Sequence, residues 1–484
     1  MYKPYTALLL LLCCLPAAAA DEDNDAQLRR LRFENREALR QQEEKTLEEG
    51  GETASAQTAD NTAQNLPLGI LGAVNRGDAR ETARLLAQYR ALPGYDADLA
   101  DFAEASISRL NGDYAQALAA YKALLERRPD FTRARLDYAR TLFDNRQTKE
   151  AQAQFALLQR EELPEAVNRN ADAYRRAAQM RGKWHGSLAV GAVYNSNIGE
   201  TTGRLYCFDP YGFTCAKTPP PERAHGYTYE ASAEKHRPLS GHHGLFARAA
   251  LYGTRYQDFP DNSEDTLAVS AGYRFSSAQN TWSLAPAAEW SRADSRLLYR
   301  SAGLRGEWQH DFSDTTAFNW EAEHREMRYA DDYRSNNGCL SAFHASLLHA
   351  PSHNWLFYGS ANVQKRKTQQ RASSYLLHGF QAGAQYRFGD TALLRLQASL
   401  RFRRYDGFNA WIQVRRSDRE QAYSATLKIP RLKAAGFSPV FHFKHTRVHD
   451  NAGWLAGYRK NEAGIRFERF FRSCGIKRPN AEAV

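Results

Sequence analysis

The sequence lacks a long hydrophobic run beyond its first residues, since no later stretch approaches the roughly 18 apolar residues of a membrane-spanning helix. Its mean hydropathy is −0.65 and 25% of its residues are charged, values that are typical of a soluble protein. Transmembrane β-strands escape both tests, because only every second residue of such a strand faces lipid. The composition therefore argues against membrane helices and leaves a membrane β-barrel open.

The sequence also lacks the motifs of several common enzyme classes. It has no Walker loop, no HExxH helix and no GxSxG elbow. His242 and His243 are adjacent, but no second pair of ligands flanks them, which favours a solvated turn over a metal site. The net charge of +10 fits arginines and lysines scattered over loops and a lumen better than nucleic-acid binding. We therefore expect a non-enzymatic protein without a cofactor, a metal or a nucleic-acid partner.

What the sequence does contain, from residue 183 to residue 471, is an alternation of apolar and polar residues. In residues 394–404 the leucines, Ala398 and Phe402 fall on one face, whereas Arg395, Arg401 and Arg403 fall on the other. One face suits lipid and the other a wet lumen. Fourteen such runs lie at about 183–194, 225–237, 243–256, 264–276, 280–292, 297–310, 314–328, 338–350, 354–366, 373–388, 391–404, 418–429, 438–449 and 458–471.

The connections between these runs alternate in length, as they do in single-chain outer-membrane barrels. Short polar turns occur at 277–279, 312–313, 351–353 and 389–390. Longer segments occur at 195–224, 329–337, 367–372 and 405–417. The pattern predicts a 14-stranded antiparallel transmembrane barrel over residues 183–471, with the first long loop outside the cell and the Trp184 end in the periplasm.

Charged residues on the polar faces of the predicted strands are candidates for the lumen lining. Glu321 and Glu323 alternate onto the same face as Arg325. Carboxylates this close could do acid/base work, as in an outer-membrane lipid hydrolase, but no positioned Ser and His accompany them, and a lumen of mixed charge is favoured. The candidate lumen residues are Arg305, Glu307, Glu321, Glu323, Arg325, Arg395, Arg401 and Arg403.

The N-terminus has the pattern of an export signal. Lys3 precedes an apolar run, and Ala18 to Ala20 form a small-residue cleavage site, which predicts a signal peptide over residues 1–20. A lipobox at Cys13 or Cys14 is the less favoured alternative. Residues 21–65 are charged and poor in aromatics, and we expect a flexible or partly helical leader there.

Residues 66–182 contain an internal repeat of 34 to 35 residues. Gly112, Tyr121 and Leu124 recur as Arg146, Phe155 and Leu158. The period is typical of tetratricopeptide-like helix pairs, which stack around a shared core and present a concave surface to a protein partner. The candidate client-docking residues on one predicted helix are Arg133, Asp137 and Arg140, for which a plain solvated surface is the alternative.

Two cysteines predict a disulfide. Cys207 and Cys215 stand eight positions apart in the first predicted external loop. The cell envelope is oxidising, which favours a local bridge between them.

Three segments carry a resemblance to a known family: residues 141–155 (TLFDNRQTKEAQAQF), 191–197 (GAVYNSN) and 458–471 (YRKNEAGIRFERFF). With the signal peptide, the repeats and the barrel, the chain resembles the surface lipoprotein assembly modulator (Slam) family of Gram-negative outer-membrane proteins. The tail at 472–484 departs from that pattern, because such barrels usually end on the last strand.

The resemblance implies a cell outer-membrane barrel with its helical domain in the periplasm. It also implies a translocon that delivers surface lipoproteins, or secreted clients that capture host iron or haem proteins, to the cell surface. The implied partners are the client, a periplasmic chaperone, the barrel assembly machinery and outer-membrane lipid. An exopolysaccharide export porin, which also joins such repeats to a barrel, is the alternative.

Overall fold

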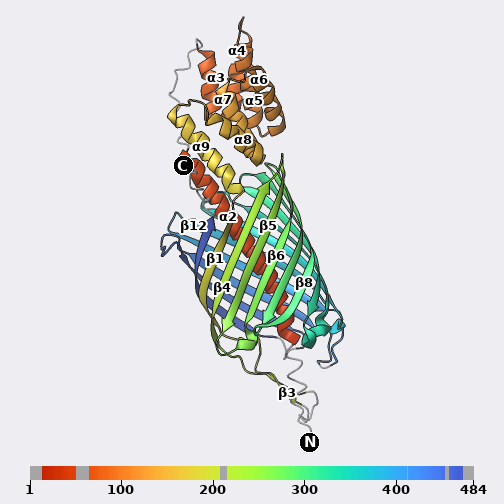
Figure 1. The fold of residues 1–484 in the computed structure, drawn as a ribbon. Helices are drawn as coiled ribbons and strands as arrows, with labels where there is room; N and C mark the ends of the chain where they lie inside the picture. The colour runs from red at the N-terminus through yellow and green to blue at the C-terminus, as the bar shows by residue number, and fades with distance from the viewer. Residues whose placement is uncertain (1–13, 51–64, 208–214, 411, 453–456, 473–484) are drawn as a thin grey trace, which may run out of the picture.

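The computed structural model describes residues 14–50, 65–207, 215–410, 412–452 and 457–472, and Figure 1 shows their arrangement. A helical domain lies at one end of a closed β-barrel, and one long helix runs from that domain through the barrel. Among the described residues, no helix combines the length and the apolar character needed to cross a membrane.

The barrel contains fourteen strands in the described part of the chain, all paired antiparallel with their neighbours. Strand β1 pairs with both β4 and β16, which closes the sheet and leaves no free edge. The strands are β1 (His185–Asn195), β4 (Ala224–Pro238), β5 (His243–Tyr256), β6 (Glu264–Ser276), β7 (Asn280–Ala293), β8 (Arg296–Ser313), β9 (Thr316–Tyr329), β10 (Gly338–His349), β11 (Trp355–Thr368), β12 (Tyr375–Phe388), β13 (Ala392–Tyr405), β14 (Ser417–Lys428), β15 (Ser438–Asp450) and β16 (Arg459–Arg472).

The predicted barrel is confirmed. Strands β5 and β6 have the predicted bounds, and β8 differs most, because it continues to Ser313 through an irregular register near Asp311. Alternation places large apolar side chains on the outer surface, such as Leu304 and Leu396, which are 58% and 51% exposed. In a membrane these side chains contact lipid, since the band around such a barrel is apolar.

The helical domain consists of hairpins that stack along the chain, as the repeat predicted. Its helices are α3 (Leu66–Arg76), α4 (Ala79–Arg90), α5 (Ala97–Leu110), α6 (Tyr114–Arg127), α7 (Thr132–Asp144), α8 (Thr148–Leu158) and α9 (Glu165–Arg181). A residue with positive φ recurs at the repeat interval: Gly77 at 72°, Gly112 at 83° and Arg146 at 62°. Such left-handed residues end a helix and redirect the chain. Tyr121 and Phe155, at equivalent repeat positions, are fully buried.

Helix α2 (Cys14–Gly50) is the largest difference between the prediction and the structure. We expected a flexible or partly helical leader over residues 21–65, whereas residues 14–50 form one continuous helix of 37 residues. Residues 14–20 belong to the predicted signal peptide, so the mature part of the helix begins at Asp21. At 1.5 Å per residue that part is about 45 Å long, still more than the roughly 30 Å of a bilayer core. Figure 1 shows this helix in red inside the barrel. The rest of the leader, residues 51–64, and the tail at 473–484 lie outside the described residues.

The helical domain contacts the end of the barrel that carries the short turns. Glu150 on α8 accepts a hydrogen bond from the Gly241 backbone N–H at 2.8 Å, and Gln147 lies 3.4 Å from His242. The long connection between β1 and β4, which includes the hairpin of β2 (Leu205–Cys207) and β3 (Cys215–Lys217), projects from the opposite end (Figure 1). The short turns and the helical domain therefore lie in the periplasm, and the hairpin lies outside the cell.

A closed barrel without free edges resists unfolding by detergent. We expect unheated full-length protein to migrate faster in a detergent gel than heated protein, while a fragment of residues 66–182 shows no such difference. Equal migration of heated and unheated full-length protein would contradict the closed barrel.

Candidate functional site

The lumen is lined by charged side chains of β7, β8 and β9 that pair with one another. Arg305 contacts Glu323 at 2.6 Å and Glu321 at 3.4 Å. Arg325 contacts Glu289 at 2.9 Å and Glu323 at 3.7 Å. These side chains are 15% exposed or less, so the wall is a dense network of paired charge.

Glu307 also lies on β8, and the other three predicted lumen residues lie on β13, in a separate group. Arg401 contacts Glu420 at 3.3 Å, and Arg403 contacts Asp418 at 3.5 Å. Arg395 donates to Gln385 at 2.9 Å. The sequence therefore predicted which residues of these strands face the lumen. The structure adds that β13 lies beside β14, so the arginines of β13 contact carboxylates of β14 rather than those of β9.

A cavity of about 1570 Å³ runs around α2 from the helical domain to the far end of the barrel. Of the predicted lumen residues, those that line it are Glu307, Glu321, Arg395, Arg401 and Arg403. A smaller pocket between α2 and the wall is lined by Arg305, Glu323 and Arg325. All these side chains therefore face inward.

Arginines of α2 contact carboxylates on one part of the wall. Arg30 lies 2.5 Å from Glu230 on β4. Arg32 lies 2.7 Å from Glu307 on β8 and 2.9 Å from Glu321 on β9. Two of the predicted lumen carboxylates, Glu307 and Glu321, thus bind an arginine of the chain's own N-terminal helix, and the sequence alone gave no indication of that partner.

Acidic and amide groups of α2 contact other parts of the wall. Glu34 lies 3.5 Å from Arg395 on β13 and 3.5 Å from Arg466 on β16. Asn35 donates to the Ser232 hydroxyl on β4 at 2.7 Å. The arginines of the helix therefore face carboxylates of the wall, and Glu34 faces arginines of the wall. These pairs stabilise the helix in the lumen, because every buried charge needs a partner.

Of the three predicted docking residues, Asp137 occupies a different position from the one expected. Asp137 on α7 is fully buried, with Arg133 at 3.0 Å and Arg140 at 3.2 Å. Arg133 also donates to Asn75 on α3 at 2.7 Å, and Arg140 donates to Asn170 on α9. The prediction that Asp137 lines an accessible face is wrong, because its carboxylate is buried and holds two arginines of α7 that in turn contact α3 and α9.

Three nearby arginines determine the charge state of this buried carboxyl. Burial raises the pKa of Asp137, but the positive charges of Arg133, Arg140 and Arg109 outweigh burial and hold the pKa below its ordinary value of 3.8. Asp137 is therefore ionised in the folded domain at neutral pH.

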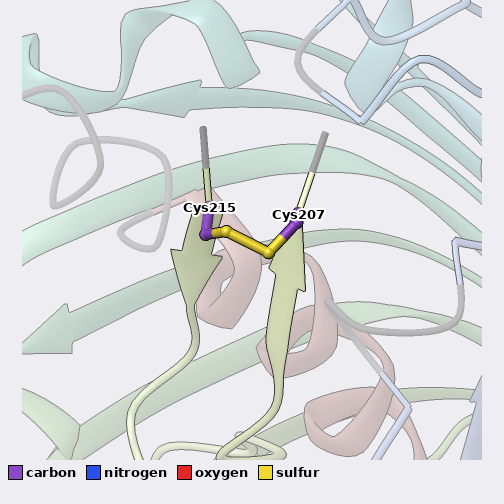
Figure 2. The surroundings of a disulfide bond; sticks show 2 residues. All are labelled: Cys207 and Cys215. Carbon is purple, nitrogen blue, oxygen red and sulfur yellow. A yellow bond between two sulfur atoms is a disulfide. The ribbon is translucent and has the colours of Figure 1, made fainter. Parts of the chain in front are cut away.

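A disulfide joins Cys207 and Cys215 across β2 and β3, with an S–S distance of 2.05 Å (Figure 2). The two cysteines face each other in the register of this hairpin. This is the pair that the sequence predicted, and it lies in the external connection between β1 and β4.

Comparisons with known proteins match both parts of the chain. Residues 184–471 match the family described as surface lipoprotein assembly modifier, and residues 53–155 match its N-terminal repeats. The chain is 29% identical over 405 residues to the hemophilin secretion modulator of Acinetobacter baumannii, which covers 80% of this chain and 82% of that protein.

Two further relatives bear the family's name. The chain is 27% identical to surface lipoprotein assembly modifier 2 of Neisseria meningitidis, over 78% of this chain and 81% of that protein. It is 23% identical to the surface lipoprotein assembly modifier of Pasteurella multocida, over 83% of this chain and 82% of that protein.

Replacement of the buried carboxyl tests its structural role. We expect Asp137→Ala to lower the free energy of unfolding of the 66–182 fragment by about 3–5 kcal/mol in urea, because two arginines lose their shared partner. The exposed Asp130, paired with Arg128, supplies the matched control Asp130→Ala, which should have little effect. Equal losses in the two variants would contradict the role of Asp137.

The effect of Asp137→Ala on the free energy of unfolding should depend on pH. Because the pKa of Asp137 is lower in the folded state than in the unfolded state, its contribution to stability is present above about pH 3.9 and is lost as the pH falls through the folded pKa. The difference in unfolding free energy between wild type and Asp137→Ala should therefore shrink below about pH 3.9. A difference that stays constant down to pH 2 would refute this assignment.

Removal of the disulfide should affect the external hairpin and leave the barrel intact. A ring of about 15 residues contributes roughly 3 kcal/mol, and this ring is smaller. We expect the double variant Cys207→Ser, Cys215→Ser to keep its heat-dependent gel shift but to be cut faster by protease in residues 196–223. Labelling of both thiols in native wild-type protein without reductant would show that no bridge forms.

Proposed function

The chain belongs to the surface lipoprotein assembly modifier family, and on that premise we propose that it is an outer-membrane translocon. Its clients are surface lipoproteins, or secreted proteins of the kind that the name of the Acinetobacter relative indicates. The observation that carries this proposal is the polar lumen, which runs the length of the barrel and opens toward a periplasmic repeat domain. A polar lumen can pass a polypeptide segment, since water and charged walls replace its hydration.

The energy for this transport has to come from the client. The sequence has no phosphate-binding loop, and the periplasm and outer membrane contain no nucleotide supply. Folding of the client outside the cell would retain it there, because a folded domain no longer fits the route by which its extended chain arrived.

The repeat domain is the part of the molecule that we assign to client capture. Stacked helix pairs commonly present a concave surface to a protein partner. Arg133 and Arg140 stay candidates for such contacts, although each also pairs with Asp137, and their side chains are 32% and 18% exposed. A periplasmic chaperone that hands over the client, and the barrel assembly machinery that inserts this chain, are further proposed partners.

The alternative of exopolysaccharide export rested on the combination of helical repeats with a barrel. Both of those parts match models of the surface lipoprotein family instead, and the β13 wall offers arginines rather than aromatic platforms for sugars.

A comparison of cell surfaces tests the proposed function. Intact cells that lack the gene and complemented cells are labelled with a membrane-impermeant biotin reagent, and the labelled proteins are identified by mass spectrometry. We expect one or a few lipoproteins or secreted proteins to disappear from the surface of the deletion strain while their total amount stays unchanged. An unchanged set of surface proteins, together with loss of surface polysaccharide, would refute the translocon.

Deletion of the repeat domain tests its assigned role. We expect a chain without residues 66–182 to form a heat-modifiable barrel in the outer membrane but to leave those same proteins unlabelled at the surface. Full display of the clients by this truncated chain would show that the repeat domain is not needed for capture.

A further inference from the structure

Helix α2 fills the route that the proposed function requires. Its residues 25–37 contact the walls of the lumen, and the remaining cavity surrounds it. A helix with its side chains is about 10–12 Å across, so α2 takes up lumen space that a passing polypeptide would need. The structure therefore shows the barrel with its lumen occupied by a segment of its own chain.

The contacts that hold α2 are mostly polar. Leu28 and Leu31 form a small buried cluster with Ala250 and Tyr252, and the other contacts described above are ion pairs and hydrogen bonds. Polar contacts in a wet lumen can be exchanged for contacts with water when a helix leaves, which costs far less than separating two apolar surfaces.

Most of the wall charges that contact α2 also have partners on the wall, whereas Glu230 on β4 is paired with Arg30 and Gln27 of α2 itself. Glu307 also pairs with Arg248 at 2.9 Å, and Glu321 also lies 3.4 Å from Arg305. Arg466, which binds Glu34 of α2, also lies 3.5 Å from Glu468. Removal of α2 would therefore leave these wall charges paired, and the strong penalty for an unpaired buried charge is avoided.

The other end of α2 belongs to the repeat domain. Glu43 accepts hydrogen bonds from Arg181 at the end of α9 and lies 3.6 Å from Arg146 at the end of α7. Leu47 packs against the core formed by helices α7, α8 and α9. One continuous helix thus joins the domain assigned to client capture with the interior of the barrel.

We propose that the lumen surface covered by α2 is the surface that a passing client chain contacts, and that α2 is its displaceable occupant. The inference rests on the proposed function. The chemistry of the wall specifies the occupant: a hydrophilic polypeptide segment with arginine or lysine facing the glutamates of β4, β8 and β9, and with glutamate or aspartate facing the arginines of β9, β13 and β16. Helix α2 meets this description itself, and the client replaces it.

A reversible lock tests the proposal in the full chain. Asn35→Cys and Ser232→Cys place thiols at a position where α2 and β4 are hydrogen-bonded at 2.7 Å. Cys339 and Cys474 are replaced by Ser, and the pair is linked with a short, reducible bifunctional methanethiosulfonate reagent. The matched control carries Ser232→Cys alone, which reacts with the reagent but cannot be linked to α2.

The readout is surface biotinylation of the proteins that disappear from the surface of the deletion strain. We expect the linked protein to display less than about a tenth of the newly made client, with recovery after reduction, while the single-cysteine control stays at the wild-type level in both conditions. Normal display by the linked protein would overturn the proposal and leave the translocon with another route. Failure of the proposed function is distinguishable, because unlocked wild-type protein would then display no client.

Ion current supplies a second measurement that needs no client. Arg32→Ala removes the contacts of α2 with Glu307 and Glu321, whereas the control Arg40→Ala removes an exposed pair with Glu44 on the same helix. We expect purified Arg32→Ala protein in a planar bilayer with KCl to be open at least about tenfold more often than wild type, which corresponds to only 1.4 kcal/mol. Equal open probabilities for wild type, Arg32→Ala and Arg40→Ala would show that these contacts do not hold a plug.

Discussion

Pairing of charge inside the barrel is the interaction on which the rest of this structure depends. A lumen that is wet but narrow can hold arginines and glutamates only when each has a partner, since an unpaired buried charge is strongly destabilising. The strands β8 and β9 meet this requirement with Arg305, Arg325 and the glutamates between them. Helix α2 satisfies the same requirement, because Arg30, Arg32 and Glu34 each have a partner on the wall. A charged segment is thereby held in an ordered position inside the lumen.

The periodicity of the sequence was sufficient to predict the barrel and the repeats. Lipid on one side and water on the other require alternation, and this requirement marks every strand, so that the predicted ends of β5 and β6 agree with the structure. The stacked hairpins need a turn of fixed geometry at a fixed interval, which Gly112 and Arg146 supply at equivalent positions. Both patterns are local in the chain, and the sequence displays them directly.

The position of α2 was not predictable in the same way. The helix is rich in Glu, Arg, Gln and Ala, which favour helix formation but give it no continuous apolar face. Its stabilising partners, such as Glu307 and Arg466, lie hundreds of residues away, and only the closed barrel brings them together. Asp137 was misplaced for a related reason: charge suggested exposure, whereas two arginines and the neighbouring helices keep it buried. Burial of charge depends on partners that a linear pattern does not reveal.

In the proposed translocon, the client passes through the lumen of the barrel. Site-specific photocrosslinking tests this claim most directly, with a photoreactive amino acid placed at Gln397, which lines the cavity, or at its neighbour Leu396, which is 51% exposed on the outer face of the same strand. During export in living cells, the probe at Gln397 should crosslink to the client and the probe at Leu396 should not. Crosslinks to the client from Leu396 alone would place the route outside the lumen and contradict the account.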